Sequence, residues 1–189
     1  MSGRPVVVLD ACVLANYALC DTLLRLAEAP RLFEPKWSEE ILQETMRVLE
    51  RKLGWPAALT ARFQHALQAH FAESWIFGYE PLVGRMTNDP KDRHVAAAAV
   101  HAGAPLIVTL NLRHFGKEHL SPWGIDAIHP QAFLRGLYQT DPVLVAAKLE
   151  QQATDRGRSL SALLDILGAT VPDFVQLLRA TLTHHDAAM

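Results

Sequence analysis

The chain has 189 residues, of which 50% are hydrophobic and 20% are charged, and this ordinary globular balance excludes a disordered protein. The length allows one domain with a proper core, or one domain and a small helical appendage. The chain has 18 basic and 20 acidic residues, so its formal net charge is −2. This charge excludes attraction of a nucleic acid by a general positive field. Binding of a nucleic acid would therefore need a local basic patch or bound cations.

The sequence has no recognisable targeting segment and no cysteine motif. No apolar run approaches the roughly 20 residues that a bilayer-spanning helix needs, and the N-terminal stretch lacks the features of a signal peptide. The two cysteines, Cys12 and Cys20, do not have the spacing of a metal or redox motif, and we interpret them as small core residues in a reducing compartment. We therefore expect a soluble, cytoplasmic protein with no membrane partner.

The first half of the chain alternates short apolar runs with amphipathic stretches. Residues 6–9 are apolar and rich in β-branched side chains, which is typical of a strand buried on both faces of a parallel sheet, and the run ends on Asp10. Asp21 and Ser38 each precede an apolar-periodic stretch and are predicted to cap helices. Further strands are predicted at residues 32–35 and 75–77, and helices are predicted from Ser38 to about Leu53, where Gly54 ends the helix, and from Pro56 to about Phe71.

The second half continues the same alternation as far as residue 138. Asp89-Pro90 predicts a helix start, with Asp89 as the N-cap, Asp92 at the third helical position and an alanine-rich helix that runs to His101. Because strands alternate with helices, the sequence predicts a three-layer α/β/α sandwich with a central parallel sheet. The remaining elements of this part are strands predicted at residues 105–109 and 125–128 and a helix predicted at residues 130–138.

The pattern changes at residues 140–142, Thr-Asp-Pro. Beyond this point it is purely helical, with predicted helices at residues 142–154, 159–167 and 172–183. We therefore predict a first domain over residues 1–139 and a small all-helical C-terminal appendage over residues 140–189.

Several polar residues follow the predicted strands. In a parallel sheet, functional groups gather beyond the carboxyl ends of the strands. The first strand ends on Asp10, a later one ends on Thr109 and Asn111, and the helix that begins near Asp89 starts at the same edge. Carboxylates placed together repel one another unless a divalent cation neutralises them, and oxygen ligands of this kind suit Mg²⁺ or Mn²⁺ rather than zinc.

Each of these residues also has an ordinary structural interpretation. Asp10 would serve as a cap for the next turn, Asp89 as a helix N-cap, and Asp92 as a complement to the helix dipole. Glu44 falls on a partly apolar helical face, where a carboxylate needs a partner or a metal, although surface glutamates are common. Asn111 would be a plain turn residue. Spacing alone leaves these alternatives open.

Four segments, in this order and spacing, resemble the PIN-domain family. The family opens with an apolar strand that delivers an aspartate, continues with a helix that supplies a glutamate and with an aspartate before an alanine-rich helix, and closes with a strand followed by Thr-x-Asp/Asn. The corresponding segments are residues 7–14, 38–44, 88–98 and 106–115, and the resemblance covers roughly residues 4–138. The bacterial VapC toxins of type II toxin–antitoxin systems are the most similar group, and one VapC subgroup carries a helical C-terminal extension like that after Asp141.

The resemblance implies an acidic active site. It assigns catalytic roles to Asp10, Glu44 and Asp92, and metal binding to Asp10, Asp92, Asn111 and Asp89. Asn111 stands where many members have a fourth acid, so one negative charge is lost there. This departure leaves the number of metal ions open, with Asp89 as a replacement carboxylate.

The activity implied is that of a toxin endoribonuclease that hydrolyses RNA phosphodiester bonds with Mg²⁺ or Mn²⁺ and leaves a 5′-phosphate and a 3′-hydroxyl. A cognate antitoxin would cover the acidic site, and the protein would be a homodimer. Basic residues near the acidic edge are candidates for phosphate contacts; these are Arg93, Arg113, His114 and Lys117.

Three alternatives remain. The first is a PIN nuclease for RNA processing that has no antitoxin. The second is a degenerate, non-catalytic PIN-like binding module, which only Asn111 supports and which Asp10, Glu44 and Asp92 argue against. The third is a nucleotide-binding flavodoxin-like or Rossmann-like domain, which the lack of a glycine-rich loop after the first strand disfavours.

Overall fold

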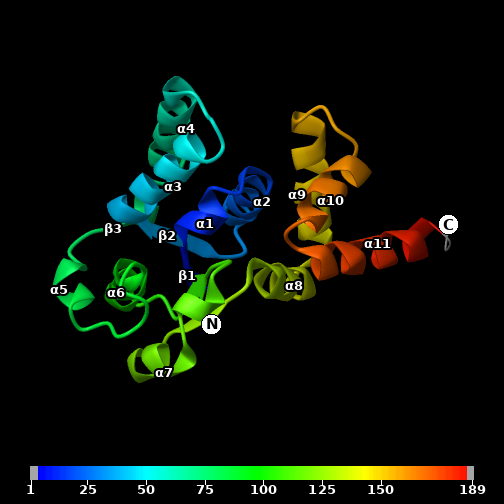
Figure 1. Ribbon diagram of the computed structural model, residues 1–189. Coiled ribbons are helices and arrows are strands. Elements are labelled where there is room, and N and C mark those ends of the chain that lie inside the picture. Colours follow the sequence, from blue (N-terminus) through cyan, green and yellow to red (C-terminus); the bar gives the residue numbers. More distant parts are fainter. Residues whose placement is uncertain (1–3, 187–189) are drawn as a thin grey trace.

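A five-stranded, all-parallel sheet with strand order β3-β2-β1-β4-β5 forms the centre of the molecule. The computed structural model describes residues 4–186, with side chains to residue 181. Helices cover both faces of the sheet, so the predicted three-layer α/β/α sandwich is confirmed (Figure 1). The strands are β1 (Val6–Leu9), β2 (Glu34–Ser38), β3 (Trp75–Ile76), β4 (Leu106–Val108) and β5 (Asp126–Ile128).

Strand β1 is the central strand, as its continuous apolar sequence predicts. Val7 pairs with Pro35 on one side and with Leu106 on the other, and residues 7–9 are completely buried. The chain first builds outward from β1 through β2 to β3 and then returns to place β4 on the opposite side of β1. The carboxyl ends of β1 and β4 therefore meet at a topological switch point, where open α/β sheets form their binding crevices.

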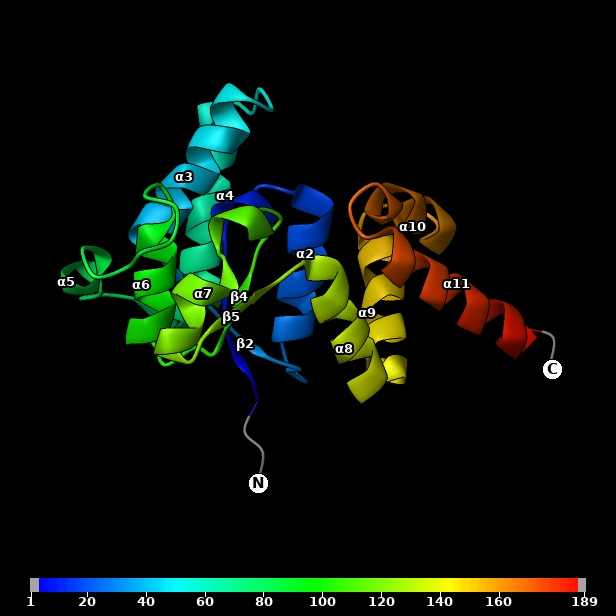
Figure 2. The ribbon, with the colours of Figure 1, turned by 60° about the horizontal axis from the view of Figure 1, so that its bottom comes forward.

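The helices form two outer layers. Figure 2 shows α3 and α6 on one side of the sheet and α2 and α8 on the other, with the C-terminal helices beyond α2 and α8. The alanines of α6 are buried, and their small side chains let this helix lie close to β1, β2 and β4. The helices are α1 (Ala11–Leu14), α2 (Tyr17–Ala27), α3 (Glu39–Arg51), α4 (Ala57–His70), α5 (Glu80–Val83), α6 (Arg93–His101), α7 (Lys117–Leu120), α8 (Pro130–Thr140), α9 (Pro142–Asp155), α10 (Leu160–Gly168) and α11 (Pro172–Asp186), with short 3₁₀ turns at Ala72–Ser74, Leu112–His114 and Ser121–Trp123.

The predicted start of α3 is confirmed, whereas the predicted start of α2 is wrong. Ser38 caps α3 as predicted, because its Oγ accepts a hydrogen bond from the backbone N–H of Ile41 at 3.3 Å. The prediction that Asp21 caps a helix is wrong. Helix α2 begins one turn earlier, with Asn16 as the cap, and Asp21 lies inside it and forms an ion pair with Arg25.

The predicted cap at Asp89 is also wrong. Helix α6 begins at Arg93, so Asp92 occupies the cap position instead of the third helical position. Asp89 closes a separate turn before the helix: its Oδ1 accepts from the N–H of Lys91 at 3.0 Å, and its carbonyl oxygen accepts from the N–H of Asp92 at 2.9 Å. A short aspartate side chain is equally suited to a helix N-cap and to this turn. The sequence alone does not distinguish the two structures.

The second strand begins later than predicted, at Glu34 instead of residue 32. Its sequence Glu-Pro-Lys-Trp-Ser lacks an apolar run, but burial alternates along it, and Pro35 and Trp37 face the core. Only two large buried residues alternate with charged ones in this segment, so the sequence pattern of a strand is weak here. This weakness explains the wrong prediction of where the strand begins.

The C-terminal helices pack on α2 and continue the hydrophobic core. Phe174 of α11 is completely buried, and buried Gln152 of α9 accepts a hydrogen bond from Thr22 at 2.8 Å. Arg25 reaches across to Asp155 at 2.7 Å. The three C-terminal helices are thus those predicted, while the domain boundary at residue 140 stays a prediction.

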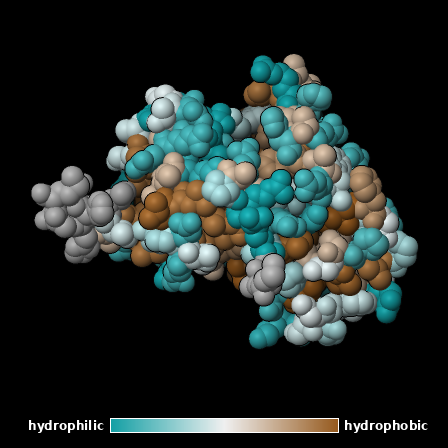
Figure 3. Space-filling model, turned by 180° about the vertical axis from the view of Figure 1, so that it is seen from behind, coloured by the Kyte–Doolittle hydropathy of each residue, from teal (hydrophilic) through white to brown (hydrophobic). Residues whose placement is uncertain are grey.

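An apolar hollow of about 450 Å³ lies among α8, α9, α10 and α11. Figure 3, which views the molecule from behind, shows hydrophobic surface close to the C-terminal end of the chain. Within residues 4–186, no helix combines the length and the apolar character that crossing a bilayer requires.

Candidate functional site

A cleft of about 820 Å³ opens at the carboxyl edge of the sheet, at the switch point between β1 and β4. Its walls come from the residues that follow these two strands, from one face of α3 and from the turn before α6. The predicted acids Asp10, Glu44 and Asp92 all line this cleft, together with Asn111. Residues that lie far apart in the sequence are therefore brought together at one edge.

Asp10 is held rigidly at the base of the cleft. It is 2% exposed, and its backbone N–H continues the sheet by donating to the carbonyl of Val108 at 3.1 Å. One carboxylate oxygen, Oδ2, accepts hydrogen bonds from the hydroxyl of Thr109 at 2.6 Å and from the thiol of Cys12 at 3.1 Å. Both donors bind the same oxygen, and they fix the direction in which the carboxylate points.

Cys12 therefore has a different environment from the one predicted. Cys20 is buried in the core, but Cys12 is only partly buried and lines the cleft. Burial and the neighbouring charge of Asp10 raise the pKa of the Cys12 thiol to about 12, so it remains a protonated donor at neutral pH. Both cysteines are free thiols.

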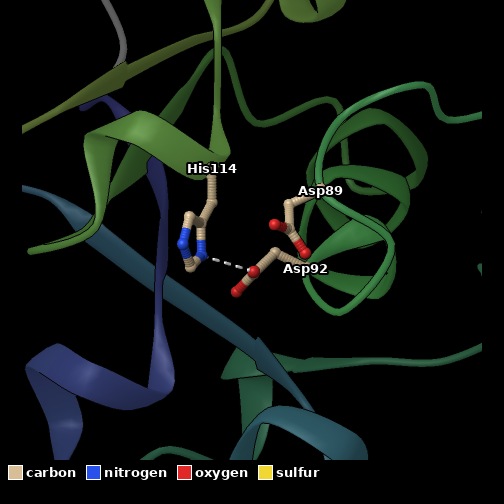
Figure 4. Close-up of side chains that lie close together, drawn as sticks. All are labelled: Asp89, Asp92 and His114. Carbon is tan, nitrogen blue, oxygen red and sulfur yellow. Dashed lines mark hydrogen bonds and ion pairs between the residues drawn. The ribbon is translucent and has the colours of Figure 1, made fainter.

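Asp92 lies on the other side of the cleft base and is held by a histidine. Figure 4 shows Asp89, Asp92 and His114 converging, with a hydrogen bond of 2.9 Å between Nδ1 of His114 and Oδ2 of Asp92. The guanidinium Nε of Arg113 donates to Nε2 of the same ring at 3.1 Å. Because Nε2 accepts that bond, the proton of a neutral ring is on Nδ1, and His114 donates it to Asp92.

The electrostatics of Asp92 show that the site gathers negative charge. Burial raises the pKa of Asp92 above its ordinary value, the charges of Asp10 and Asp89 raise it further, and the hydrogen bond with His114 opposes both. Desolvated carboxylates that repel one another are the arrangement that a bound cation relieves.

Glu44 reaches the cleft from α3 and has a partner that the sequence did not suggest. Its Oε2 lies 3.5 Å from Nε2 of His94, which is only 5% exposed, and its Oε1 lies 3.9 Å from Nη2 of Arg47. The contact with His94 lowers the pKa of Glu44 below its usual value, so this carboxylate stays ionised. Burial works to lower the pKa of His94, but the neighbouring acids Glu44, Glu40 and Asp92 raise it overall.

The neutral residue Asn111 also lines the cleft. Its backbone N–H donates to the hydroxyl of Thr109 at 3.0 Å. Thr109 thus connects Asp10 and the turn at Asn111, which gives it a defined structural role beyond ending the strand. The sequence placed Thr109 at this edge but did not show which side chain it would bind.

The basic residues of the cleft differ from those predicted to contact phosphate. Among Arg93, Arg113, His114 and Lys117, His114 lines the cleft, whereas Arg93 donates to the carbonyl of Asn88 at 3.3 Å and Lys117 is exposed at the start of α7. The cleft is instead lined by three other basic residues, Arg47, Lys52 and Lys91. The position of Arg47 three residues after Glu44, and hence on the same helical face, is the signal that would have identified it.

The donor set fits a hard divalent cation. The cleft offers the carboxylates of Asp10, Asp92 and Glu44 and the amide oxygen of Asn111, all of them oxygen ligands of the kind that Mg²⁺ and Mn²⁺ prefer. Within the described residues, Asp89, Asp92 and His114 also bring possible ligand atoms within 4.8 Å of one another. The ring nitrogen of His114 that faces Asp92 carries a proton, so we assign this histidine to the support of Asp92 and the ligand role to the oxygens.

Comparison with known proteins agrees with this geometry. Residues 6–113 match the family model described as "PIN domain", and this segment is more than half of the chain. Over 104 residues the chain is 41% identical to "Putative ribonuclease VapC50" of Mycobacterium tuberculosis (strain ATCC 25618 / H37Rv), which is 53% of this chain and 62% of that relative. The match therefore spans less than two thirds of the relative's length. No solved structure matches the chain.

The matched segment contains β1, β2, β3 and β4 and each acid that lines the cleft. On the family match, the parallel three-layer fold and the acidic edge together, this chain belongs to the PIN-domain family.

Proposed function

We propose that the protein is a toxin endoribonuclease of a toxin–antitoxin system, which hydrolyses RNA phosphodiester bonds with Mg²⁺ or Mn²⁺. The observation that carries the proposal is the convergence of Asp10, Glu44 and Asp92 in one cleft at the switch point of the sheet. Membership of the PIN-domain family and the similarity to a protein named as a ribonuclease support it.

In this proposal Asp10 and Asp92 hold the divalent cation, with Asn111 and Asp89 as further oxygen ligands. When bound, the cation neutralises the phosphate charge and lowers the pKa of a coordinated water. The question of one or two ions depends on whether the neutral Asn111 and the turn residue Asp89 complete a second site.

The chain's own groups account for orientation and proton transfer. Thr109 fixes the Asp10 carboxylate and His114 fixes that of Asp92, so both acids are arranged before the substrate arrives. Glu44 is ionised and half-exposed at the cleft, where it can accept a proton from the attacking water as a general base. Arg47, one turn along α3, is placed to contact the phosphate backbone of the substrate.

The biological assignment follows the resemblance and the name of the relative. We propose that a cognate antitoxin covers the cleft and that the active protein is a cytoplasmic homodimer. The RNA-processing alternative shares the same chemistry and lacks the antitoxin.

The nuclease proposal is tested with the purified full chain. It should cleave RNA in the presence of Mg²⁺ or Mn²⁺, stop on addition of EDTA, and recover when the metal is restored. Asp10→Asn and Asp92→Asn should each reduce cleavage by about a hundredfold or more, because changes to residues that merely support metal ligands already cost 10–100-fold. Asp126→Asn is the matched control, since Asp126 is exposed at the opposite, amino end of β5. Equal cleavage by the two site variants and the unchanged protein would overturn the proposal.

The toxin assignment needs a cellular test. Induction of the unchanged protein should stop bacterial growth, induction of Asp92→Asn should not, and co-expression of the small protein encoded beside it should restore growth. RNA cleavage without any effect on growth would favour the RNA-processing alternative.

A further inference from the structure

The cleft extends beyond the acids to a wall that the proposed chemistry does not use. Tyr17 and Leu53 line it, and they are 40% and 56% exposed. Val48 adds to the same wall. One end of the cleft is therefore acidic and the other is apolar and aromatic.

Helix α3 shows how the two ends are connected. Its cleft-facing residues are Glu44, then Arg47 and Val48 one turn later, then Lys52 and Leu53 just past the end of the helix. Along this one element the side chains that line the cleft change from acidic to basic and then to apolar. At about 1.5 Å per residue, Leu53 lies roughly 14 Å from Glu44 along the helix axis. A ligand that fits this order has a phosphate at the acids and a flat apolar group beyond it.

The aromatic ring at the apolar end is held by one residue of the C-terminal helices and by one residue of the loop after α3. The guanidinium of Arg156, at the end of α9, lies 4.5 Å from the centre of the Tyr17 ring. Arg156 is itself held by Asp21, with Nη2 and Nε at 2.8 and 2.9 Å from Oδ2. Trp55 packs against the same ring in an edge-to-face arrangement, with ring centres 5.3 Å apart.

A second contact fixes the backbone at this point. The side-chain amide of Asn16, the residue before Tyr17, donates to the hydroxyl of Thr170 at 2.9 Å. Tyr17 is also the first residue of α2, so its position depends on that helix start. The C-terminal helices thus support one wall of the cleft, and none of their side chains described up to residue 181 lines its acidic end.

We propose that Tyr17 contacts an unpaired base of the RNA substrate and that Arg156 is the positioning residue for its ring. This inference rests on the proposed nuclease function and assigns the substrate's base to the apolar end of the cleft. An RNA duplex keeps its bases stacked inside and presents phosphate and sugar, whereas an unpaired base can lie against an aromatic side chain. The phosphates then follow Arg47 and Lys52 toward the acids.

The experiment measures RNA binding apart from cleavage, in the full chain carrying Asp10→Asn. The probes are a short end-labelled oligoadenylate and an abasic ribose–phosphate strand of the same length, followed by fluorescence anisotropy. Tyr17→Ala should weaken binding of the oligoadenylate by about tenfold and leave binding of the abasic strand unchanged. Tyr17→Phe should bind both probes as the parent does.

The role of Arg156 is tested by a double-mutant cycle. Arg156→Gln should weaken oligoadenylate binding by less than Tyr17→Ala, and the double variant should bind no more weakly than Tyr17→Ala alone. Matched controls are Arg158→Gln, which removes the same charge two residues away, and Phe77→Ala, which removes an exposed aromatic ring outside the cleft. Circular dichroism of each variant checks that the fold is kept.

Two results would overturn the inference. One is unchanged oligoadenylate binding by Tyr17→Ala, and the other is an equal loss for the abasic strand, which would mean that no base is recognised. Either result leaves the nuclease proposal standing if the unchanged protein still cleaves RNA. A protein that neither binds nor cleaves RNA would contradict both proposals together.

Discussion

The two walls of the cleft are built in different ways. At the sheet edge, Asp10 is almost completely buried and is oriented by the hydroxyl of Thr109, which lies directly after the neighbouring strand. At the helical wall, Tyr17 is exposed and is held by Arg156 and Trp55, which come from other parts of the chain. The Asp10 carboxylate therefore depends on the central sheet, whereas the ring of Tyr17, which we propose contacts the substrate, depends in part on the packing of the C-terminal helices.

The largest effect on stability is expected from a change in the C-terminal helices that support the helical wall. Phe174→Ala removes a completely buried ring from α11, and we expect the free energy of unfolding to fall by about 3–5 kcal/mol. Urea denaturation of the full chain measures this change. Val143→Ala, at an exposed position of α9, is the control and should change stability by less than about 0.5 kcal/mol. A loss for Phe174→Ala as small as that of the control would show that α11 does not share the core.

The sheet edge is tested by Thr109→Val, which keeps the side-chain shape and removes the hydroxyl that donates to Asp10. We expect RNA cleavage at saturating substrate to fall by about 10–100-fold, with little change in KM, because the variant misorients a metal ligand without touching the helical wall. Steady-state kinetics with a labelled RNA measure this split. Thr109→Ser should restore most of the activity. A rise in KM with unchanged kcat would contradict the assignment of the two walls.

Asn111→Asp adds a carboxylate to the acidic wall of the cleft. We expect the Mg²⁺ concentration that gives half-maximal cleavage to fall by about tenfold, because the affinity of oxygen-ligand sites rises with their charge. A titration of activity against Mg²⁺ measures the change. The same requirement for Mg²⁺ in both proteins would place Asn111 outside the metal site.

The smallest effect is expected from Thr170→Val, which removes the hydroxyl that accepts a hydrogen bond from Asn16. Loss of one partly buried hydrogen bond should lower the free energy of unfolding by about 0.5–1.5 kcal/mol. Thr154→Val is the comparison, because that hydroxyl donates to the carbonyl of Glu150 in its own helix. Equal urea midpoints for the Thr170 variant and the unchanged protein would show that the contact does not stabilise the wall.

Local patterns predicted most of the fold. The apolar run at residues 6–9 identified the central strand, and Ser38 identified the start of α3, because both signals are contained in a few neighbouring residues. The sequence failed where several short-range solutions compete. Asn16 and Asp21 are both good caps, and only the packed structure shows that α2 begins at the first of them.

The acidic residues of the candidate site were predicted from the sequence, but the residues that contact them were not. Asp10 and Asp92 follow recognisable local patterns, but His94 lies 50 residues from Glu44, and Thr109 lies 99 residues from Asp10. Such contacts depend on strand order and register, which cannot be deduced from the sequence alone. The contact of Arg156 with Tyr17 depends further on how the C-terminal helices pack, and no pattern near either residue indicates it.

The position of Asp10 at the end of the central strand also determines how the site responds to local opening. Its backbone amide is bonded to Val108 inside the sheet, between the most deeply buried strands. Amides in such places exchange with solvent only when the whole domain unfolds, so hydrogen exchange at Asp10 should be among the slowest in the protein. Fraying or a local fluctuation elsewhere would therefore leave the Asp10 carboxylate in place.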